Sequence, residues 1–245
     1  MRSPTQLPER ELIEYISAQR WYGSKGREVA HAAVVDCAEL PGLLVALVEV
    51  QFPEGTHETY QLVAGDELDG LAEDPVAREL VHLLRSGRAQ ATTGEGTIEF
   101  HAVEGFAGLG TELTSSRVIG SEQSNSSVVF DEELILKVYR RLEPGVNPEL
   151  EMLRFLGEHQ FESIAPLGGW YAYRGRPVEA TLGVLQQFLP TAEDGWELAL
   201  DELADAPDRF LGRVRRLGEV TGAMHAVLAS DAADPAFCPE DPSPE

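Results

Sequence analysis

The chain has 245 residues, of which 43% are apolar, and its 42 acidic and 19 basic residues give a formal net charge of −23. This length suffices for one large domain or two smaller lobes, and the apolar content excludes a largely disordered chain. The charge argues against nucleic acid or an anionic membrane as a partner, because both attract a positive face. We interpret the acidic excess as a source of solubility.

The apolar runs and the two cysteines indicate the cellular compartment that we expect for the protein. The longest apolar run, residues 42–50, is too short to cross a bilayer. The first residues, MRSPTQLPERELIE, turn acidic where a secretion signal would need an apolar core. Cys37 and Cys238 are far apart and lack Cys-x-x-Cys spacing, so we expect two reduced thiols in a cytoplasmic protein.

The first hundred residues predict a small α+β unit. In chain order it holds a helix, a basic loop (RWYGSKGR), two strands, a second helix and a third strand, at residues 9–19, 20–27, 43–52, 58–64, 74–86 and 97–103. Asp74 is expected to cap the second helix, with Pro75 at its first position and Gly87 at its end. The Gly-rich segment 105–110 then links this unit to the next.

The next part predicts an antiparallel sheet with helices. Three strands and a later hairpin are expected at residues 117–120, 126–130, 134–139, 168–173 and 178–189. Asn147 and Pro148 begin one helix, and Asp194 begins another, for which it is suited as an N-cap.

A longer helix is expected over residues 207–229. Its apolar residues recur at helical spacing, at Phe210, Val214, Leu217, Thr221, Met224 and Leu228. Gly218 and Gly222 lie inside it at a cost in helix stability, so we expect another backbone to pack closely there. We expect His225 to be a structural core residue. The Pro-rich, acidic residues after it are typical of a linker or tail.

Lys137, one of only two lysines, lies inside the apolar strand LILKVY. On an exposed sheet edge it would act as a gatekeeper against strand pairing. On an inner face it would need a counter-charge, because an unpaired buried ammonium is strongly unfavourable. Alternation places Lys137 on the same face as Ile135 and Tyr139, which is not a solvated pattern. Both hypotheses remain open from composition alone.

The helix that begins at Pro148 offers two carboxylates as partners. Glu149 complements the helix dipole and needs no further role. Glu151 lies deeper, beside Met152 and Leu153, and is the better candidate to reach Lys137. A strand lysine paired with a helix glutamate is how protein-kinase-like folds hold nucleotide phosphates.

The preceding turn, GSEQSNSS at residues 120–127, supplies hydrogen-bond donors. The hydroxyl and N–H groups of its last four residues could face phosphate oxygens, namely Ser124, Asn125, Ser126 and Ser127. An ordinary hairpin turn has the same composition, so this signal is weak by itself.

Several segments together resemble the bacterial maltokinases. These are EQSNSSVVF, LILKVYRRLEPGVNPELE and VLQQFLP followed by EDGWE, with RWYGSKGR similar to a segment of the maltokinase cap. The resemblance runs from about residue 20 to residue 241. It implies an α+β fold of the aminoglycoside-phosphotransferase type: a cap subdomain (1–104), a kinase-like N-lobe (105–190) and the first helices of a C-lobe (191–245).

The resemblance also implies an activity and residue roles. Maltokinases transfer a phosphoryl group from ATP to the anomeric hydroxyl of maltose, and the maltose 1-phosphate formed serves α-glucan (glycogen) synthesis. By position, Ser124 to Ser127 would face the phosphates, Lys137 would hold them and Glu151 would orient Lys137. The backbone of a hinge at residues 186–189, including Gln187 and Leu189, would bind the adenine.

One departure from the maltokinase pattern bears on activity. Kinases of this fold need a catalytic aspartate and ligands for Mg²⁺, the first in a His-Gly-Asp type of loop, and the chain contains no His-Gly-Asp. We therefore expect the chain alone to be inactive, with the Mg²⁺ ligands outside it and with a C-terminal kinase half as a possible partner. An aminosugar (glucosamine) kinase and a non-catalytic cap or regulatory module are the rival interpretations.

Overall fold

The computed structural model describes residues 4–106, 112–119 and 124–239. The chain divides into two compact units. The first unit comprises Met1–Leu150 and Pro166–Phe188, and the second comprises Glu151–Ala165 and Leu189–Glu245. In the part of the chain that is described, no helix combines the length and apolar character needed to span a membrane.

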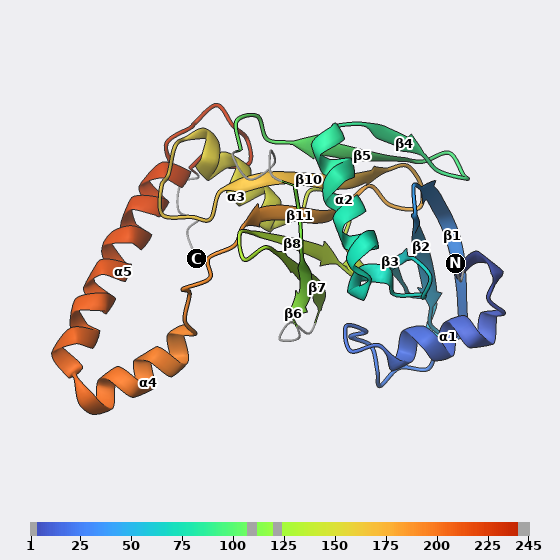
Figure 1. Ribbon diagram of the computed structural model, residues 1–245, viewed down its shortest axis with the longest axis horizontal. Helices are drawn as coiled ribbons and strands as arrows, with labels where there is room; N and C mark the ends of the chain where they lie inside the picture. Colours follow the sequence, from blue (N-terminus) through green and yellow to red (C-terminus); the bar gives the residue numbers. More distant parts are fainter. Residues whose placement is uncertain (1–3, 107–111, 120–123, 240–245) are drawn as a thin grey trace. The chain divides into compact units, whose positions relative to one another are not determined.

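A four-stranded antiparallel sheet forms the N-terminal part of the first unit (Figure 1). Its order is β1-β2-β3-β9, with bounds His31–Leu40, Leu43–Gln51, His57–Ala64 and Arg141–Leu142. The 3₁₀ helix η1 (Pro4–Gln6) and α1 (Glu9–Ala18) precede it. α1 packs against β1 and buries Leu12 and Ile16. The sequence predicted β2 and β3 but missed β1, whose long run of mixed apolar and acidic residues lacks a clean alternation.

The RWYGSKGR segment is part of the core of this sheet. The Trp21 and Tyr22 rings are buried and both contact the ring of Tyr60, with centroids 5.7 and 5.4 Å apart. Ser24 donates to the buried carboxylate of Glu58 at 3.0 Å, and the Tyr60 hydroxyl donates to the same carboxylate at 2.6 Å. The predicted basic loop is therefore a structural element that folds back onto β3.

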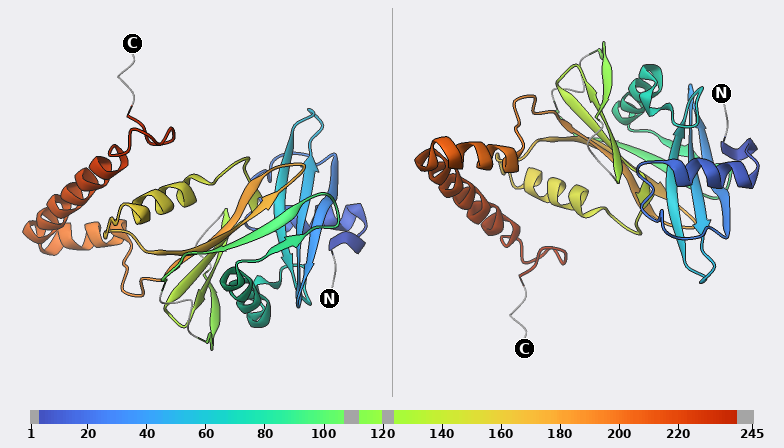
Figure 2. Two further views of the ribbon diagram at one scale, coloured as in Figure 1. Left: turned by 90° about the horizontal axis from the view of Figure 1, so that it is seen from above. Right: turned by 90° about the horizontal axis from the view of Figure 1, so that it is seen from below.

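A seven-stranded antiparallel sheet completes the first unit (Figure 2). Its order is β4-β5-β10-β11-β8-β7-β6, with bounds Ala89–Ala91, Thr97–Ala102, Leu167–Arg174, Ala180–Gln187, Leu134–Tyr139, Asn125–Phe130 and Ser116–Ile119. The 3₁₀ helix η2 (Gly70–Ala72) leads into α2 (Asp74–Ser86), which packs against β5 and β10. The N-cap of α2 is Glu73, one residue before the predicted Asp74, and Gly87 ends it in the left-handed conformation.

The predicted boundary near residue 104 does not separate the two sheets. β4 and β5 precede it, yet β5 pairs with β10 along its whole length, from Thr97 opposite Arg174 to Ala102 opposite Gly169. β4 and β5 therefore belong to the same sheet as the strands of the predicted kinase-like lobe. The division of the chain into a cap and a kinase-like lobe stays a prediction.

Buried polar groups join the two sheets of the first unit. The Gln61 amide donates to the carbonyl oxygens of Tyr139 and Leu182, both at 2.9 Å, and accepts from the Tyr171 hydroxyl. The fully buried guanidinium of Arg140 donates to both carboxylate oxygens of Asp69 at 2.7 Å. Because buried polar groups are costly unless paired, the Gln61 bonds fix how the sheets meet, and the Arg140–Asp69 pair holds the segment before η2 against them.

Asp36 is the centre of a second buried hydrogen-bond network in the same unit. Its buried carboxylate accepts hydrogen bonds from the Thr92 and Tyr173 hydroxyls and from the Gly94 and Cys37 amides. Burial raises the pKa of Asp36, but these donors outweigh burial and leave its pKa below the ordinary value. The carboxylate therefore ties β1 to the turn before β5 and to β10.

The second unit is helical. α3 (Pro148–Glu158) runs into it from the first unit, and α4 (Gly195–Asp205) and α5 (Pro207–Leu228) follow. Asp194 caps α4 as predicted, accepting from the Trp196 and Glu197 amides. Buried Glu202 links the two later helices through Arg209 and Arg213, at 2.8 and 2.9 Å.

Three expectations for α5 are wrong. Among the described residues none of α5 is buried: Val214 and Leu217 of its predicted apolar stripe are exposed, and the other four stripe residues are only partly buried. His225 is exposed instead of lying in a core. A Cβ added at Gly218 or Gly222 would meet no described atom within 4 Å outside the helix itself, so no described backbone packs there. Helical spacing indicates which side can be buried, whereas burial itself needs a partner.

Candidate nucleotide-binding site

Lys137 lies in the interior of the seven-stranded sheet. It belongs to β8, which pairs with β7 on one side and with β11 on the other. The gatekeeper hypothesis required an exposed edge and is therefore wrong. The Lys137 side chain is 22% exposed, so its stem is packed and its ammonium reaches a partly solvated place.

The partner of Lys137 is Glu149 rather than the predicted Glu151. The Lys137 ammonium donates to one carboxylate oxygen of Glu149 at 2.8 Å, and the Tyr139 hydroxyl donates to the other at 2.9 Å. Glu151 is exposed. Residues two apart lie on nearly opposite sides of a helix, so only one of the two glutamates can face β8. The apolar residues next to Glu151 in the sequence did not indicate which of the two glutamates faces β8.

The segment before α3 decides that it is Glu149. The Asn147 side chain accepts from the Glu149 amide at 2.9 Å, which confirms Asn147 as the N-cap. The Asn147 amide in turn donates to the Thr181 hydroxyl on β11 at 2.9 Å. Gly145, with φ of +91°, donates to the Glu179 carbonyl at 2.7 Å. The first turn of α3 is thus anchored to the sheet that carries Lys137.

Ser127 shares the face of Lys137, and Ser126 does not. Ser127 is directly opposite Lys137 in the β7–β8 register, and opposite residues project to the same side. Its hydroxyl is buried and has no hydrogen-bond partner among the described residues. The Ser126 hydroxyl accepts from the Arg140 guanidinium at 2.8 Å on the other face. The prediction that Ser126 faces phosphate is therefore wrong, because successive strand residues alternate.

The remaining residues of the predicted phosphate loop are less constrained. Asn125 begins β7 opposite Tyr139, on the side of Ser127, and is partly buried. Ser124 is exposed. Residues 120–123 lie outside the described residues. A phosphate-facing role for Ser124 and Asn125 stays a prediction.

The predicted hinge follows β11. The Gln187 amide already donates to the Pro166 carbonyl at 3.0 Å, and the Phe188 amide donates to the Glu133 carbonyl at 2.7 Å. These two N–H groups hold the strand end and are not available to a base in this arrangement. Leu189 begins the second unit and is about half exposed. An adenine contact by the Gln187 or Leu189 backbone stays a prediction.

The arrangement favours an anionic ligand. An ammonium has three N–H donors, and Glu149 accepts from one of those of Lys137. The buried Ser127 hydroxyl on the same face is a further donor. The described residues contain no group of three or more His, Cys, Asp or Glu able to hold a metal ion, so the predicted Mg²⁺ is given no ligands here.

The sequence did not predict the roles of two residues, Tyr139 beside Lys137 and Arg140 on the opposite face of the sheet. Tyr139 holds the second oxygen of Glu149, and its position two residues after Lys137 on the same strand was the available signal. Arg140 was seen only as part of a motif. Arg140 is buried because the next residues, β9, pair with β3. No local pattern in the sequence predicts this pairing.

Comparison with known proteins gives a family match over part of the chain. Residues 15–81 match the maltokinase N-terminal cap domain. This segment runs from α1 into α2 and includes most of the four-stranded sheet. The cap expected from RWYGSKGR is thereby supported. The match covers a minority of the chain, so maltokinase as a whole is not established by it.

The other comparisons find similarity to glucosamine kinases. A glucosamine kinase from Streptacidiphilus jiangxiensis is 28% identical over 188 residues, which are 65% of this chain and 42% of that protein. A solved glucosamine kinase in complex with glucosamine, ADP and inorganic phosphate matches 89% of this chain with a TM-score of 0.59 and 23% identity. A second crystal form matches with a TM-score of 0.59 and 24% identity.

These matches confirm the predicted α+β, kinase-like fold. The chain covers 51% of each of the two solved structures. It therefore spans about half the length of the relatives that it matches.

Proposed function

We propose that this chain is the ATP-binding part of a maltokinase-like sugar kinase. The intact enzyme would transfer the terminal phosphoryl group of ATP to the anomeric hydroxyl of maltose, giving maltose 1-phosphate for α-glucan synthesis in the cytoplasm. The observation that carries the proposal is the Lys137–Glu149 ion pair on an interior strand of a kinase-like sheet. The maltokinase cap match supports this choice of sugar.

Each residue of the site has a limited role in this proposal. Lys137 would bind phosphate oxygens of ATP, and Glu149 and Tyr139 would hold its ammonium in place. Ser127 would donate its unpartnered hydroxyl to the same phosphates. Bound Mg²⁺ would neutralise phosphate charge, and its ligands and the catalytic aspartate are assigned to no described residue.

Glucosamine is the second candidate acceptor. It is favoured by the glucosamine kinase relatives in both comparisons. A kinase acting on either sugar would bind ATP in the same way, so the residues described above do not discriminate between the two acceptors. An assay of the chain with a complementing C-terminal kinase half, given maltose or glucosamine in parallel, separates the two by which sugar is phosphorylated.

Nucleotide binding is tested on the chain itself. We expect ATP to raise its melting temperature, and Lys137→Ala to weaken ATP binding about 10- to 100-fold, since a charge-assisted contact contributes roughly 1.5–3 kcal/mol. Isothermal titration calorimetry measures the dissociation constant. The matched control is Lys25→Ala, because Lys25 is the other lysine and is exposed.

A second matched pair tests the corrected partner. Glu149→Gln should weaken ATP binding several-fold, because Lys137 would lose its ionic partner, whereas Glu151→Gln should leave the dissociation constant unchanged. Equal effects of Lys137→Ala and Lys25→Ala, or of the two glutamate variants, would contradict the proposed site.

A further inference from the structure

A second row of side chains lies beside Lys137 on the same face of the seven-stranded sheet. Its members are Arg117 of β6, Val129 of β7 and Ile135 of β8, which are directly opposite one another in the strand registers. Opposite residues project to the same side, and Ile135 is two residues before Lys137, so this row shares the Lys137 face. Two residues of a strand span about 7 Å. A ligand that reaches from Lys137 to this row is therefore longer than a phosphate group alone.

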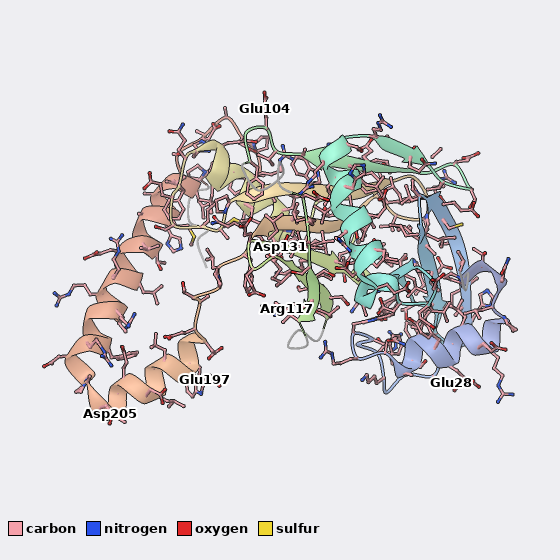
Figure 3. The ribbon with its side chains drawn as sticks, viewed as in Figure 1. Glu28, Glu104, Arg117, Asp131, Glu197 and Asp205 are labelled. Carbon is pink, nitrogen blue, oxygen red and sulfur yellow. The ribbon has the colours of Figure 1, made fainter. Side chains whose placement is uncertain are left out.

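This row offers a flat surface that is partly apolar. Val129 is 1% exposed and Ile135 is partly buried. Beside them the guanidinium of Arg117 lies over the ring of Phe188, with its carbon atom 5.5 Å from the ring centroid (Figure 3). Nucleic-acid bases stack on aromatic rings and on guanidinium planes. The row therefore suits the base of a nucleotide.

Glu132 fixes the orientation of this guanidinium. Its two carboxylate oxygens accept from Nε and Nη2 of Arg117 at 2.6 and 2.8 Å. In such a fork both hydrogen bonds lie close to the guanidinium plane, so the carboxylate covers neither face of it. The faces are the surfaces that stack. The pair with Glu132 therefore orients Arg117 and leaves its stacking surface available.

The turn that carries Glu132 is held by the segment before β6. The preceding residue, Asp131, accepts from the amides of Thr114 and Ser115 at 2.9 and 2.8 Å. Thr114 and Ser115 lead directly into β6, which carries Arg117. The Arg117–Glu132 pair is thus positioned before any ligand binds, and preorganised groups lose less entropy on binding.

Stability does not account for this arrangement. The side chains of Arg117 and Glu132 are 51% and 53% exposed, and ion pairs that water can reach contribute little to folding. Stacking also fits the predicted hinge, where the Gln187 and Phe188 amides are already bonded to other carbonyl oxygens. Side-chain surfaces supply base affinity where those amides do not.

We infer that Arg117 is the residue that holds the base of the bound nucleotide. Its guanidinium stacks on the ring system, while Lys137 binds the phosphates. The inference rests on the proposed nucleotide site and adds what that site requires of its ligand, which is a planar base joined to a phosphate chain. An inorganic phosphate chain lacks the base and binds without help from Arg117.

The test compares two ligands of the whole chain, ATP and inorganic triphosphate, by isothermal titration calorimetry. Arg117→Ala should weaken ATP binding about tenfold, because a stacking surface is lost, and should leave the dissociation constant of triphosphate unchanged. Lys137→Ala should weaken the binding of both ligands. The matched control is Arg174→Ala, which should leave ATP binding unchanged. The Arg174 side chain is also 51% exposed and also pairs with glutamates, on β10 of the same sheet.

Two further variants separate stacking from charge. Arg117→Trp replaces the guanidinium by another flat π surface and should keep the ATP dissociation constant within about threefold of the wild-type value. Arg117→Lys keeps a positive charge beside Glu132 but has no planar group, and it should bind ATP about as weakly as Arg117→Ala. A role in holding the turn, or in binding phosphate, predicts the reverse order. This order decides the question whatever the affinity for triphosphate.

Several outcomes would overturn the inference. These are unchanged ATP binding in Arg117→Ala, equal losses of ATP and triphosphate binding, or tighter ATP binding by the lysine variant than by the tryptophan variant. The ligand-free variants should keep the wild-type melting temperature, since the side chain is half exposed. Failure of the nucleotide site itself is distinguishable, because the wild-type chain would then bind no ATP or Lys137→Ala would have no effect.

Discussion

The two units of the chain treat the same residue types in opposite ways. Leu62 and Leu136 of the first unit are completely buried, whereas Leu211 and Leu217 of the second are 61% and 65% exposed. Both pairs occupy regular elements with the expected periodicity. The difference lies in what faces them, because each sheet of the first unit is covered by packed neighbours, whereas α5 contacts α4 and has no buried residue among those described.

Ion pairs show the same contrast. Arg140 of the first unit is buried and binds Asp69 through two short hydrogen bonds. Arg216 of the second unit is 72% exposed and lies 3.4 Å from Glu219. A buried pair cannot lose one member without leaving the other uncompensated, whereas water replaces an exposed partner. The first unit is therefore the part in which single changes have large effects.

The largest expected effect is that of Arg140→Ala. It would leave the Asp69 carboxylate and the Ser126 hydroxyl without their partner, and we expect a loss of about 3–5 kcal/mol in the free energy of unfolding. Arg216→Ala in the second unit should cost less than about 1 kcal/mol. Urea denaturation followed by fluorescence measures both. Similar losses in the two variants would remove the contrast between the units.

Leu62→Ala in the first unit and Leu217→Ala in the second test the same difference between the units with uncharged residues. It should destabilise the chain by about 2–5 kcal/mol, because a cavity forms where no water can compensate. Leu217→Ala should change the stability of the isolated chain by less than about 0.5 kcal/mol, since its side chain is already in water. A large loss from Leu217→Ala would show that α5 is covered in solution by a part of this chain.

Glu202→Gln examines the one buried polar contact of α4. Removing its charge weakens both bonds to arginine, and we expect a local loss of about 1–3 kcal/mol, seen as faster hydrogen exchange of the α4 amides. Glu219→Gln, at an exposed pair, is the matched control and should leave exchange unchanged. Unchanged α4 exchange in Glu202→Gln would mean that the hairpin is held by other contacts.

The smallest effect concerns acid stability at the turn between β7 and β8, where Asp131 is labelled in Figure 3. Hydrogen bonds from Thr114 and Ser115 lower the pKa of Asp131 to about 2. A depressed carboxyl pKa stabilises the folded state above the unfolded pKa, near pH 4, and this contribution disappears as the pH falls toward 2. Asp131→Asn should flatten this part of the profile, and melting temperatures between pH 2 and 5 measure it. An unchanged slope would count against the hydrogen-bonded turn.

Much of the local structure could be predicted from the sequence. Asn147 and Asp194 were recognised as helix caps, because a cap needs only its own side chain and the next amides. Strands β7 and β8 follow from short apolar runs on either side of a tight turn. Each of these signals involves residues within a few positions of one another.

The site itself was predicted only in part. Lys137 was placed on an inner strand face and given a glutamate partner from the next helix, and the correct glutamate was Glu149. Choosing it required knowing how Asn147 is bound to Thr181 on another strand. Ser126 and Ser127 were treated alike, although the pleat sends their side chains to opposite faces.

The sequence alone determined most of the helices and many of the strands, which sides of them could be buried, and that a lysine stands among apolar strand residues. Only the tertiary structure decided that Glu149 meets Lys137, that Arg140 is buried, and that apolar residues of α5 such as Val214 and Leu217 stay exposed among the described residues. The physical reason is that periodicity is a property of neighbouring residues, whereas burial and pairing depend on segments far apart in the chain.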